Sequence, residues 1–125
     1  MLWLGGALVK TDTVIATIAG QTDIPLTILH QLGLHNDGYR FGKDILGTPA
    51  TSLAFYDFNN GFGVVTDGSK TAFDNISRAT IHGEGPKVEE LTEIGRAYLQ
   101  VFSNDFIMRD QNERSRNSAS FRPAR

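Results

Sequence analysis

The stretch Leu53 to Phe73, LAFYDFNNGFGVVTDGSKTAF, decides the fold of this chain. The turn sequences Asn59-Asn60-Gly61 and Asp67-Gly68 divide it into three short runs rich in aromatic and other apolar residues. Asn and Gly accept the positive φ angles that tight hairpin turns require. The stretch therefore predicts a small antiparallel meander with strands at Leu53 to Phe58, Phe62 to Thr66 and Lys70 to Phe73, and Ser77 to His82 is expected to add one more.

A long helix is predicted after the meander, from Pro86 to about Met108. Apolar residues recur there at mixed spacings of three and four, and Glu89 and Glu90 lie near the positive helix end. The segment after it, 109–125, contains five arginines and three serines with little to bury, which is typical of a disordered tail. We therefore assign residues 1–108 to one folded unit and 109–125 to a solvated tail.

A shorter helix is predicted upstream of the meander, within Thr22 to Gly33. Thr22 or Asp23 is expected to be its N-cap, accepting a backbone N–H of the first turn. Pro25 is tolerated there because first-turn N–H groups have no acceptor within the helix. Gly33 is the expected left-handed stop.

The N-terminal segment is predicted to form strands. Leu2 to Val9 is a continuous apolar run, which suits a strand that is buried on both faces of a larger sheet. Thr13 to Ile18 is expected to be a second short strand. Because terminal residues normally lie at the surface, a chain that begins inside a buried strand suggests that further residues once preceded it. The predicted fold class is an α/β (α+β) fragment: edge strands of a mixed sheet, a capped helix, the meander and a long C-terminal helix.

Composition excludes several classes of function. The chain has 125 residues, 40% hydrophobic and 21% charged, with a formal charge of −2. These values are ordinary for one globular unit and give no reason to expect nucleic acid or a direct membrane contact. The sequence has no cysteine, which excludes disulfides, cysteine-based zinc sites and thiol nucleophiles.

Asp and His side chains can have either a catalytic or metal-binding role or a purely structural one. Asp23 is either a metal ligand or base, or the helix cap, and its neighbours favour the cap. His30 has no second ligand at i+4, since position 34 is Leu. His35 with Asp37 is interpreted as a small exposed pair in a loop. His82, followed by Glu84, is interpreted as solvated in a Gly-flanked turn.

The glycine pairs and the aromatic residues of the meander also allow a binding role or a structural one. The glycines at 5–6 and 61–63 lack the Gly-Lys-Ser/Thr sequence of a phosphate loop. Five aromatic residues of the meander are either a stacking platform for a carbohydrate or base, or a packed sheet face, and packing is favoured. They are Phe55, Tyr56, Phe58, Phe62 and Phe73.

Three stretches in order carry a resemblance to a known family. Leu2 to Gly6 is similar to a late core strand of that family. Gln21 to Leu29, ending at Leu32-Gly33-Leu34, is similar to its pattern of Asp, an apolar residue, a nearby Pro, Thr and two apolar residues before Leu-Gly. Phe41 to Leu46 is similar to its Phe-Gly-basic-Asp-apolar-Leu element.

On these motifs the chain resembles the C-terminal part of a sulfatase-type protein of the alkaline phosphatase superfamily. The resemblance is nearest to the lipoteichoic-acid-synthase-like branch, whose members transfer phosphoglycerol or related groups. It implies a hydroxyl or formylglycine nucleophile and a divalent metal (manganese, zinc, magnesium or calcium) in the parent. The family holds these with residues upstream of the strand at which this sequence begins, so no catalytic, cofactor-binding or metal-binding residue is assigned here. It also implies a membrane-anchored parent whose catalytic domain lies outside the cytoplasmic membrane.

Two functional hypotheses follow. In the first, the chain is a catalytically inert structural portion of a metal-dependent hydrolase or transferase, and its partner is the upstream remainder of its own catalytic domain. In the second, it is a free-standing interaction domain without enzymatic activity. An unpaired strand edge also predicts self-association.

Overall fold

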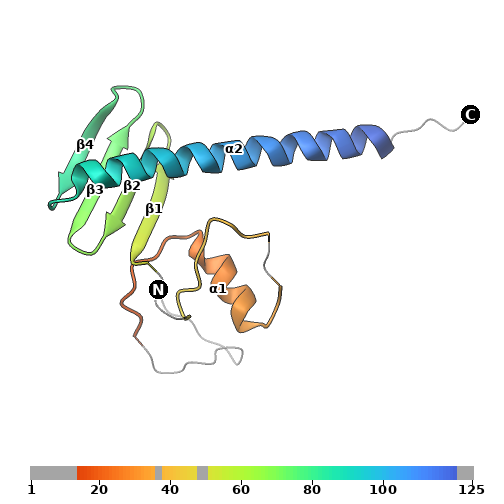
Figure 1. The fold of residues 1–125 in the computed structure, drawn as a ribbon, viewed down its shortest axis with the longest axis horizontal. Helices are drawn as coiled ribbons and strands as arrows, with labels where there is room; N and C mark the ends of the chain where they lie inside the picture. The colour runs from red at the N-terminus through yellow and green to blue at the C-terminus, as the bar shows by residue number, and fades with distance from the viewer. Residues whose placement is uncertain (1–13, 36–37, 48–50, 121–125) are drawn as a thin grey trace, which may run out of the picture.

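The computed structural model describes residues 14–35, 38–47 and 51–120, with side chains as far as 116. The elements are arranged as α1 (Asp23–Gln31), β1 (Leu53–Phe58), β2 (Gly61–Thr66), β3 (Ser69–Asp74), β4 (Ala79–Glu84) and α2 (Val88–Ser120). Figure 1 shows α2 crossing the sheet and extending beyond it, with α1 below the sheet on the side of β1. The predicted α+β arrangement, with a helix, a meander and a long C-terminal helix, is confirmed.

The sheet is a four-stranded antiparallel meander in the order β1-β2-β3-β4. The Asn59-Asn60 turn closes the first hairpin at the Phe58–Gly61 pair, and the Asp67-Gly68 turn closes the second at Thr66–Ser69. Gly68 has a φ of 76°, which explains the glycine at that turn. β4 pairs with β3 through a register shift between Ala72 and Phe73. The meander predicted from the turn sequences is therefore confirmed.

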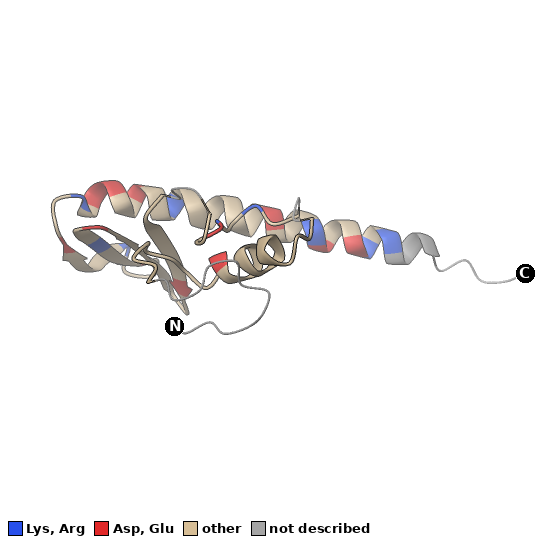
Figure 2. Cartoon of the chain, turned by 90° about the horizontal axis from the view of Figure 1, so that it is seen from below, with Lys and Arg blue, Asp and Glu red and all other residues tan. Residues whose placement is uncertain are grey.

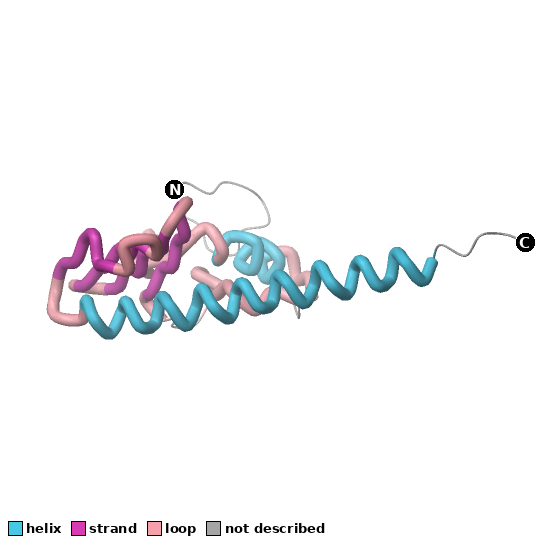
Figure 3. The backbone as a smooth tube through the Cα atoms, turned by 90° about the horizontal axis from the view of Figure 1, so that it is seen from above, coloured by secondary structure: helices cyan, strands magenta, loops and turns pink. Residues whose placement is uncertain are grey.

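The core lies between the sheet and α2. Phe62, Val64 and Phe73 are buried on one sheet face and pack with Leu91 of α2. Gly95 of α2 lies against the ring of Phe62, so that the helix approaches β2 closely at this point. A seam of two buried threonines joins the same layers, with the hydroxyls of Thr71 and Thr92 3.0 Å apart. Figure 3 shows these two layers and the length of α2 that has no sheet beneath it.

The opposite sheet face is lined by aromatic side chains over glycine. The ring of Tyr56 on β1 lies over Gly63 on β2, and the ring of Phe58 lies over Gly61. These rings cover backbone that has no side chain of its own. The two sheet faces therefore divide the aromatic residues between a buried core and a partly exposed layer.

α1 is connected to the sheet mainly through the segment 38–47. The helix ends at Gln31 with Leu32 as its C-cap, and Gly33 follows with a φ of 65°, which confirms the predicted left-handed stop. The Tyr98 hydroxyl of α2 donates a 2.8 Å hydrogen bond to the carbonyl oxygen of Phe41, and the rings of Phe41 and Phe102 are in edge contact. Segment 38–47 is thus held between α1 and α2.

Three predictions about secondary structure need correction or lie outside the described residues. Val14 to Ile18 forms no strand and has no strand partner among the described residues, although its composition favours one. The segment 109–125 was predicted to be a disordered tail, but α2 continues through it as far as Ser120, and 121–125 lies outside the described residues. His82 lies within β4 and not in a turn. The predicted strand at Leu2 to Val9 lies outside the described residues.

The charges on α2 change along its length. Figure 2 shows acidic residues at its start and a mixture of acidic and basic residues toward its end. In the later part, Arg109 pairs with Asp105 and Arg114 pairs with Asp110, each at a spacing of four. Such pairs stabilise a helix by about 0.2–0.5 kcal/mol each. None of the helices in the described part of the chain is both long enough and apolar enough to cross a bilayer.

Candidate functional site

Among the described residues, the most buried charged group is the carboxylate of Asp23, in the first turn of α1. Its Oδ2 lies 2.8 Å from the backbone nitrogen of Gly20 and 2.7 Å from Nζ of Lys43, and its Oδ1 accepts a 2.9 Å bond from the Lys43 backbone nitrogen. Nζ of Lys43 also donates a 2.7 Å bond to the carbonyl oxygen of Leu53. One carboxylate thus joins the start of α1, the segment 38–47 and the edge of β1.

This geometry corrects the interpretation of Asp23 as a side-chain cap. The N-cap position belongs to Thr22, which makes no side-chain capping hydrogen bond. The Asp23 carboxylate accepts an N–H from Gly20, before the helix, and two groups of Lys43, 20 positions later in the chain. The local pattern of Thr, Asp and Pro marked the helix start correctly but did not indicate the ion pair.

Thr27 extends the same polar cluster one turn into α1. Its side-chain oxygen donates to the carbonyl oxygen of Asp23 at 2.7 Å and accepts a 3.1 Å bond from the Ile45 nitrogen. The Lys43 carbonyl oxygen lies 3.3 Å from the same atom. Asp23 and Thr27 therefore hold both ends of the Lys43 to Ile45 stretch against α1.

The histidines do not converge. His30 on α1 pairs with Asp44, with Nδ1 and Oδ2 3.0 Å apart. His35 lies in the loop after α1, and Asp37, its predicted neighbour, lies outside the described residues. His82 is exposed on β4, at the far edge of the sheet. Each histidine belongs to a different part of the fold.

The residues present do not fit the divalent metal that the family resemblance implies for the parent. Both oxygens of Asp23 already accept hydrogen bonds, and one of the donors is the Lys43 ammonium. A cation cannot replace that ammonium without leaving Lys43 buried and unpaired. Across the part of the chain that the structure describes, no group of three acidic, His or Cys side chains is arranged to hold a metal.

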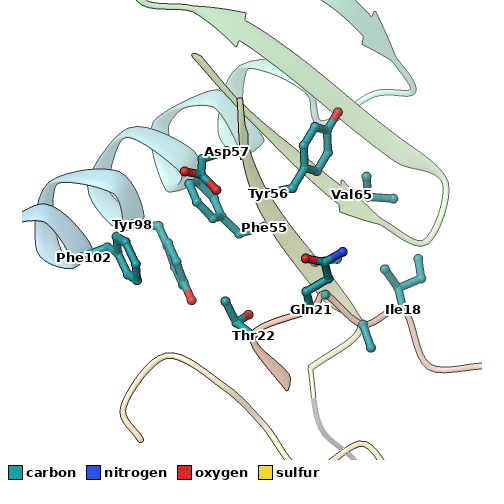
Figure 4. Close-up of a pocket in the computed structure, with 12 residues that line it drawn as sticks. Ile18, Gln21, Thr22, Phe55, Tyr56, Asp57, Val65, Tyr98 and Phe102 are labelled. Carbon is teal, nitrogen blue, oxygen red and sulfur yellow. The ribbon is translucent and has the colours of Figure 1, made fainter. Parts of the chain in front are cut away.

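A groove of about 550 Å³ lies beside this cluster, along β1 and between segment 18–22 and α2. Its walls include Phe55, Tyr98 and Phe102, with the rings of Phe55 and Tyr98 stacked at a centroid distance of 4.3 Å. Figure 4 shows Asp57 next to Phe55, and Gln21 and Thr22 below them. The groove is mainly apolar, with polar groups at its rim.

Tyr98 has an unusual role in this groove. Burial raises the pKa of its hydroxyl, the Asp23 carboxylate raises it further, and a hydrogen bond with Thr22 opposes them. Because this hydroxyl donates to the carbonyl oxygen of Phe41, Tyr98 presents its ring to the groove. Tyr98 lies within the helix predicted from Pro86 to about Met108, but the sequence gave no signal for this hydrogen bond.

The five aromatic residues of the meander fall into two groups. Phe55, Phe62 and Phe73 lie on the face toward α2, and their rings are stacked in series. Tyr56 and Phe58 lie on the other face and are 47% and 38% exposed. The favoured interpretation, a packed sheet face, describes the first group, whereas the second group is only half covered.

Comparison of the chain with family models, with curated proteins and with solved structures found no match.

Proposed function

We propose that this chain is the C-terminal structural portion of a metal-dependent, sulfatase-like hydrolase or phosphoglycerol-type transferase, and that it is catalytically inert by itself. The observation that carries this proposal is the pairing of Asp23 with Lys43. Asp23 belongs to the second of the stretches that resemble the family, and Lys43 is the basic residue of the third. A direct contact gives a physical reason for the two motifs to occur together.

The projecting part of α2 supports the same proposal. Phe106, Ile107 and Met108 are consecutive and are 67%, 52% and 65% exposed. Consecutive helical residues point in directions about 100° apart, so these three side chains spread over about 200° of the helix surface. An exposed apolar patch of this kind normally marks a contact site for a partner. The upstream remainder of the catalytic domain is the partner that we propose for this turn.

In the proposed parent, the chemistry belongs to the upstream part. The nucleophile and the divalent metal would be supplied there, where the metal would activate the nucleophile and neutralise charge on the transferred group. The described residues contribute the buried Asp23–Lys43 link and the packed sheet. The parent would be membrane-anchored, with this domain outside the cytoplasmic membrane, as the resemblance implies.

The test is an activity assay together with the upstream reading frame. The purified chain is expected to give only background turnover of a chromogenic phosphodiester or sulfate ester with added manganese or zinc. The DNA upstream of codon one is expected to encode a Thr, Ser or Cys nucleophile and an Asp-His pair in frame. Turnover by the chain alone would overturn the proposal, as would an in-frame stop codon directly upstream.

The alternative is a free-standing interaction domain, and the exposed apolar turn of α2 favours it as well. A stop codon upstream combined with loss of a specific partner on Phe106→Gln would support this alternative. The same substitution should leave the fold intact, because Phe106 is 67% exposed.

We also propose weak self-association through β4. All six residues of this edge strand are exposed, and an uncovered edge offers unpaired backbone groups to a second chain. Light scattering should show an average mass that rises with concentration, and Ile81→Lys should reduce the rise. A constant monomer mass for the unmodified chain would contradict this proposal.

A further inference from the structure

The charge in the lining of the groove beside β1 is negative. Of the described residues that line it, Asp57 is the only one with a charged side chain. The remaining walls are aromatic, aliphatic or neutral polar. Arg40 and Lys43 line an adjoining pocket that also includes Tyr98, and the Lys43 ammonium is already paired with Asp23.

The aromatic walls suit a ligand with an apolar body and a cationic end. The groove, at about 550 Å³, lies within the usual size range for small-molecule sites. Phe102 is 38% exposed, and Tyr98 offers its ring because its hydroxyl is used by Phe41. Aromatic rings attract organic cations through their negative faces, and a nearby carboxylate adds to that attraction.

We propose that this groove binds an organic ammonium group carried on an aromatic or aliphatic body. The cationic end lies at Asp57, and the apolar body lies against Phe102 and the Phe55–Tyr98 stack. Gln21 and Thr22 provide hydrogen-bonding groups at the rim of the groove. This binding needs no reactive group, so it is independent of the chemistry proposed for the parent.

The test uses three probes that share a phenyl ring and differ in the charge at the end of a short chain: 2-phenylethylammonium, 2-phenylethanol and 3-phenylpropionate. Binding is followed by NMR titration of the full chain, using backbone amide and aromatic ring shifts. The ammonium probe is expected to bind about threefold more tightly than the alcohol, with Kd on the order of millimolar, and the carboxylate most weakly. Shifts should concentrate at residues 18–22, 54–57, 98 and 102.

Variants identify the groups responsible. Asp57→Asn should reduce the difference between the ammonium and the alcohol, since it removes the carboxylate charge, keeps nearly the same shape and leaves only the attraction of the aromatic rings. Asp67→Asn is the matched control, because Asp67 lies in the β2–β3 turn and does not line the groove. Phe102→Ala should weaken all three probes together.

The outcomes that overturn the proposal are distinct. Equal affinity for the three probes would show that charge plays no part. A preference for the ammonium that Asp57→Asn leaves undiminished would show that the cationic end does not lie at Asp57, and shifts outside the groove would place the site elsewhere. Absence of saturable shifts with any probe would show that the groove binds none of them.

Discussion

Nζ of Lys43 lies 2.7 Å from Oδ2 of Asp23, although 20 positions separate the two residues, and the side chains are only 20% and 7% exposed. Ion pairs at the surface contribute little to stability, but a pair with this degree of burial cannot lose one partner without leaving the other poorly solvated. The pair also bridges α1 to β1, since Lys43 continues to the Leu53 carbonyl oxygen. It is therefore a direct polar connection between α1 and the sheet.

Asp23→Asn should lower the free energy of unfolding by about 2–4 kcal/mol, because the Lys43 ammonium keeps its burial and loses its counter-charge. Urea denaturation measures the effect. Lys43→Met in the Asp23→Asn background should recover part of the loss. Asp105→Asn, in an exposed pair on α2, is the control and should cost no more than about 0.5 kcal/mol. Equal losses of unfolding free energy for Asp23→Asn and Asp105→Asn would show that the buried pair contributes no more than an exposed one.

Gly95→Ala should destabilise the protein although alanine is the better helix former. A Cβ at this position overlaps Cε2 of Phe62, and Phe62 is fully buried. Overpacking costs about 1–3 kcal/mol, whereas the gain in helix propensity is about 1 kcal/mol. Thermal unfolding should give a lower midpoint for Gly95→Ala and no reduction for Ser103→Ala at an exposed helix position. A higher midpoint for Gly95→Ala would show that α2 and β2 are farther apart.

Ionisation of the Tyr98 hydroxyl should lower the free energy of unfolding at alkaline pH. Burial raises the pKa of its hydroxyl above the ordinary value of 10.0 in the folded chain. The folded state therefore favours the protonated form, and this contribution is complete below about pH 10 and is lost as the pH rises through the folded pKa. Tyr98→Phe should make denaturation midpoints fall less steeply above pH 10 than in the unmodified chain. Tyr56→Phe, on the half-exposed face, is the control, and an unchanged alkaline slope in Tyr98→Phe would contradict the assignment.

The local features of the fold were readable from the sequence. The turn sequences Asn59-Asn60-Gly61 and Asp67-Gly68 placed both hairpins correctly. Of their residues only Gly68 has a positive φ, so the first turn closes without one. Gly33, just after α1, also has a positive φ and was expected there as the helix stop. By contrast, Val14 to Ile18 has strand-like composition but finds no partner strand in the described residues, and a strand forms only where a second one pairs with it.

The non-local features were not readable. The carboxylate of Asp23 reaches Lys43, and the hydroxyl of Tyr98 reaches Phe41, 57 positions away. Neither contact leaves a local periodicity in the sequence. The helix beyond Arg109 was missed because its polar composition resembles a disordered tail, whereas acid–base pairs at spacing four support it. The groove depends on all these contacts together, so it could not be predicted from the sequence.

The direction of the hydrogen bond between the two buried threonines predicts which substitution costs more. The Thr92 hydroxyl donates to the carbonyl oxygen of Val88 at 2.8 Å, so it accepts a hydrogen bond from the hydroxyl of Thr71. Thr92→Val leaves the Thr71 hydroxyl, which is 1% exposed, without that acceptor. It should cost about 1–3 kcal/mol. Thr71→Val leaves Thr92 bonded to Val88 and should cost about 0.5–1.5 kcal/mol.

The double variant separates this account from simple loss of packing. Valine has nearly the shape of threonine, so Thr71→Val with Thr92→Val removes both polar groups and leaves no stranded hydroxyl. Its cost in urea denaturation should be less than the sum of the two single costs. Thr80→Val, at an exposed position on β4, should be close to neutral. If Thr71→Val cost more than Thr92→Val, the direction of the hydrogen bond would be the reverse, and if the costs were additive, the two hydroxyls would not interact.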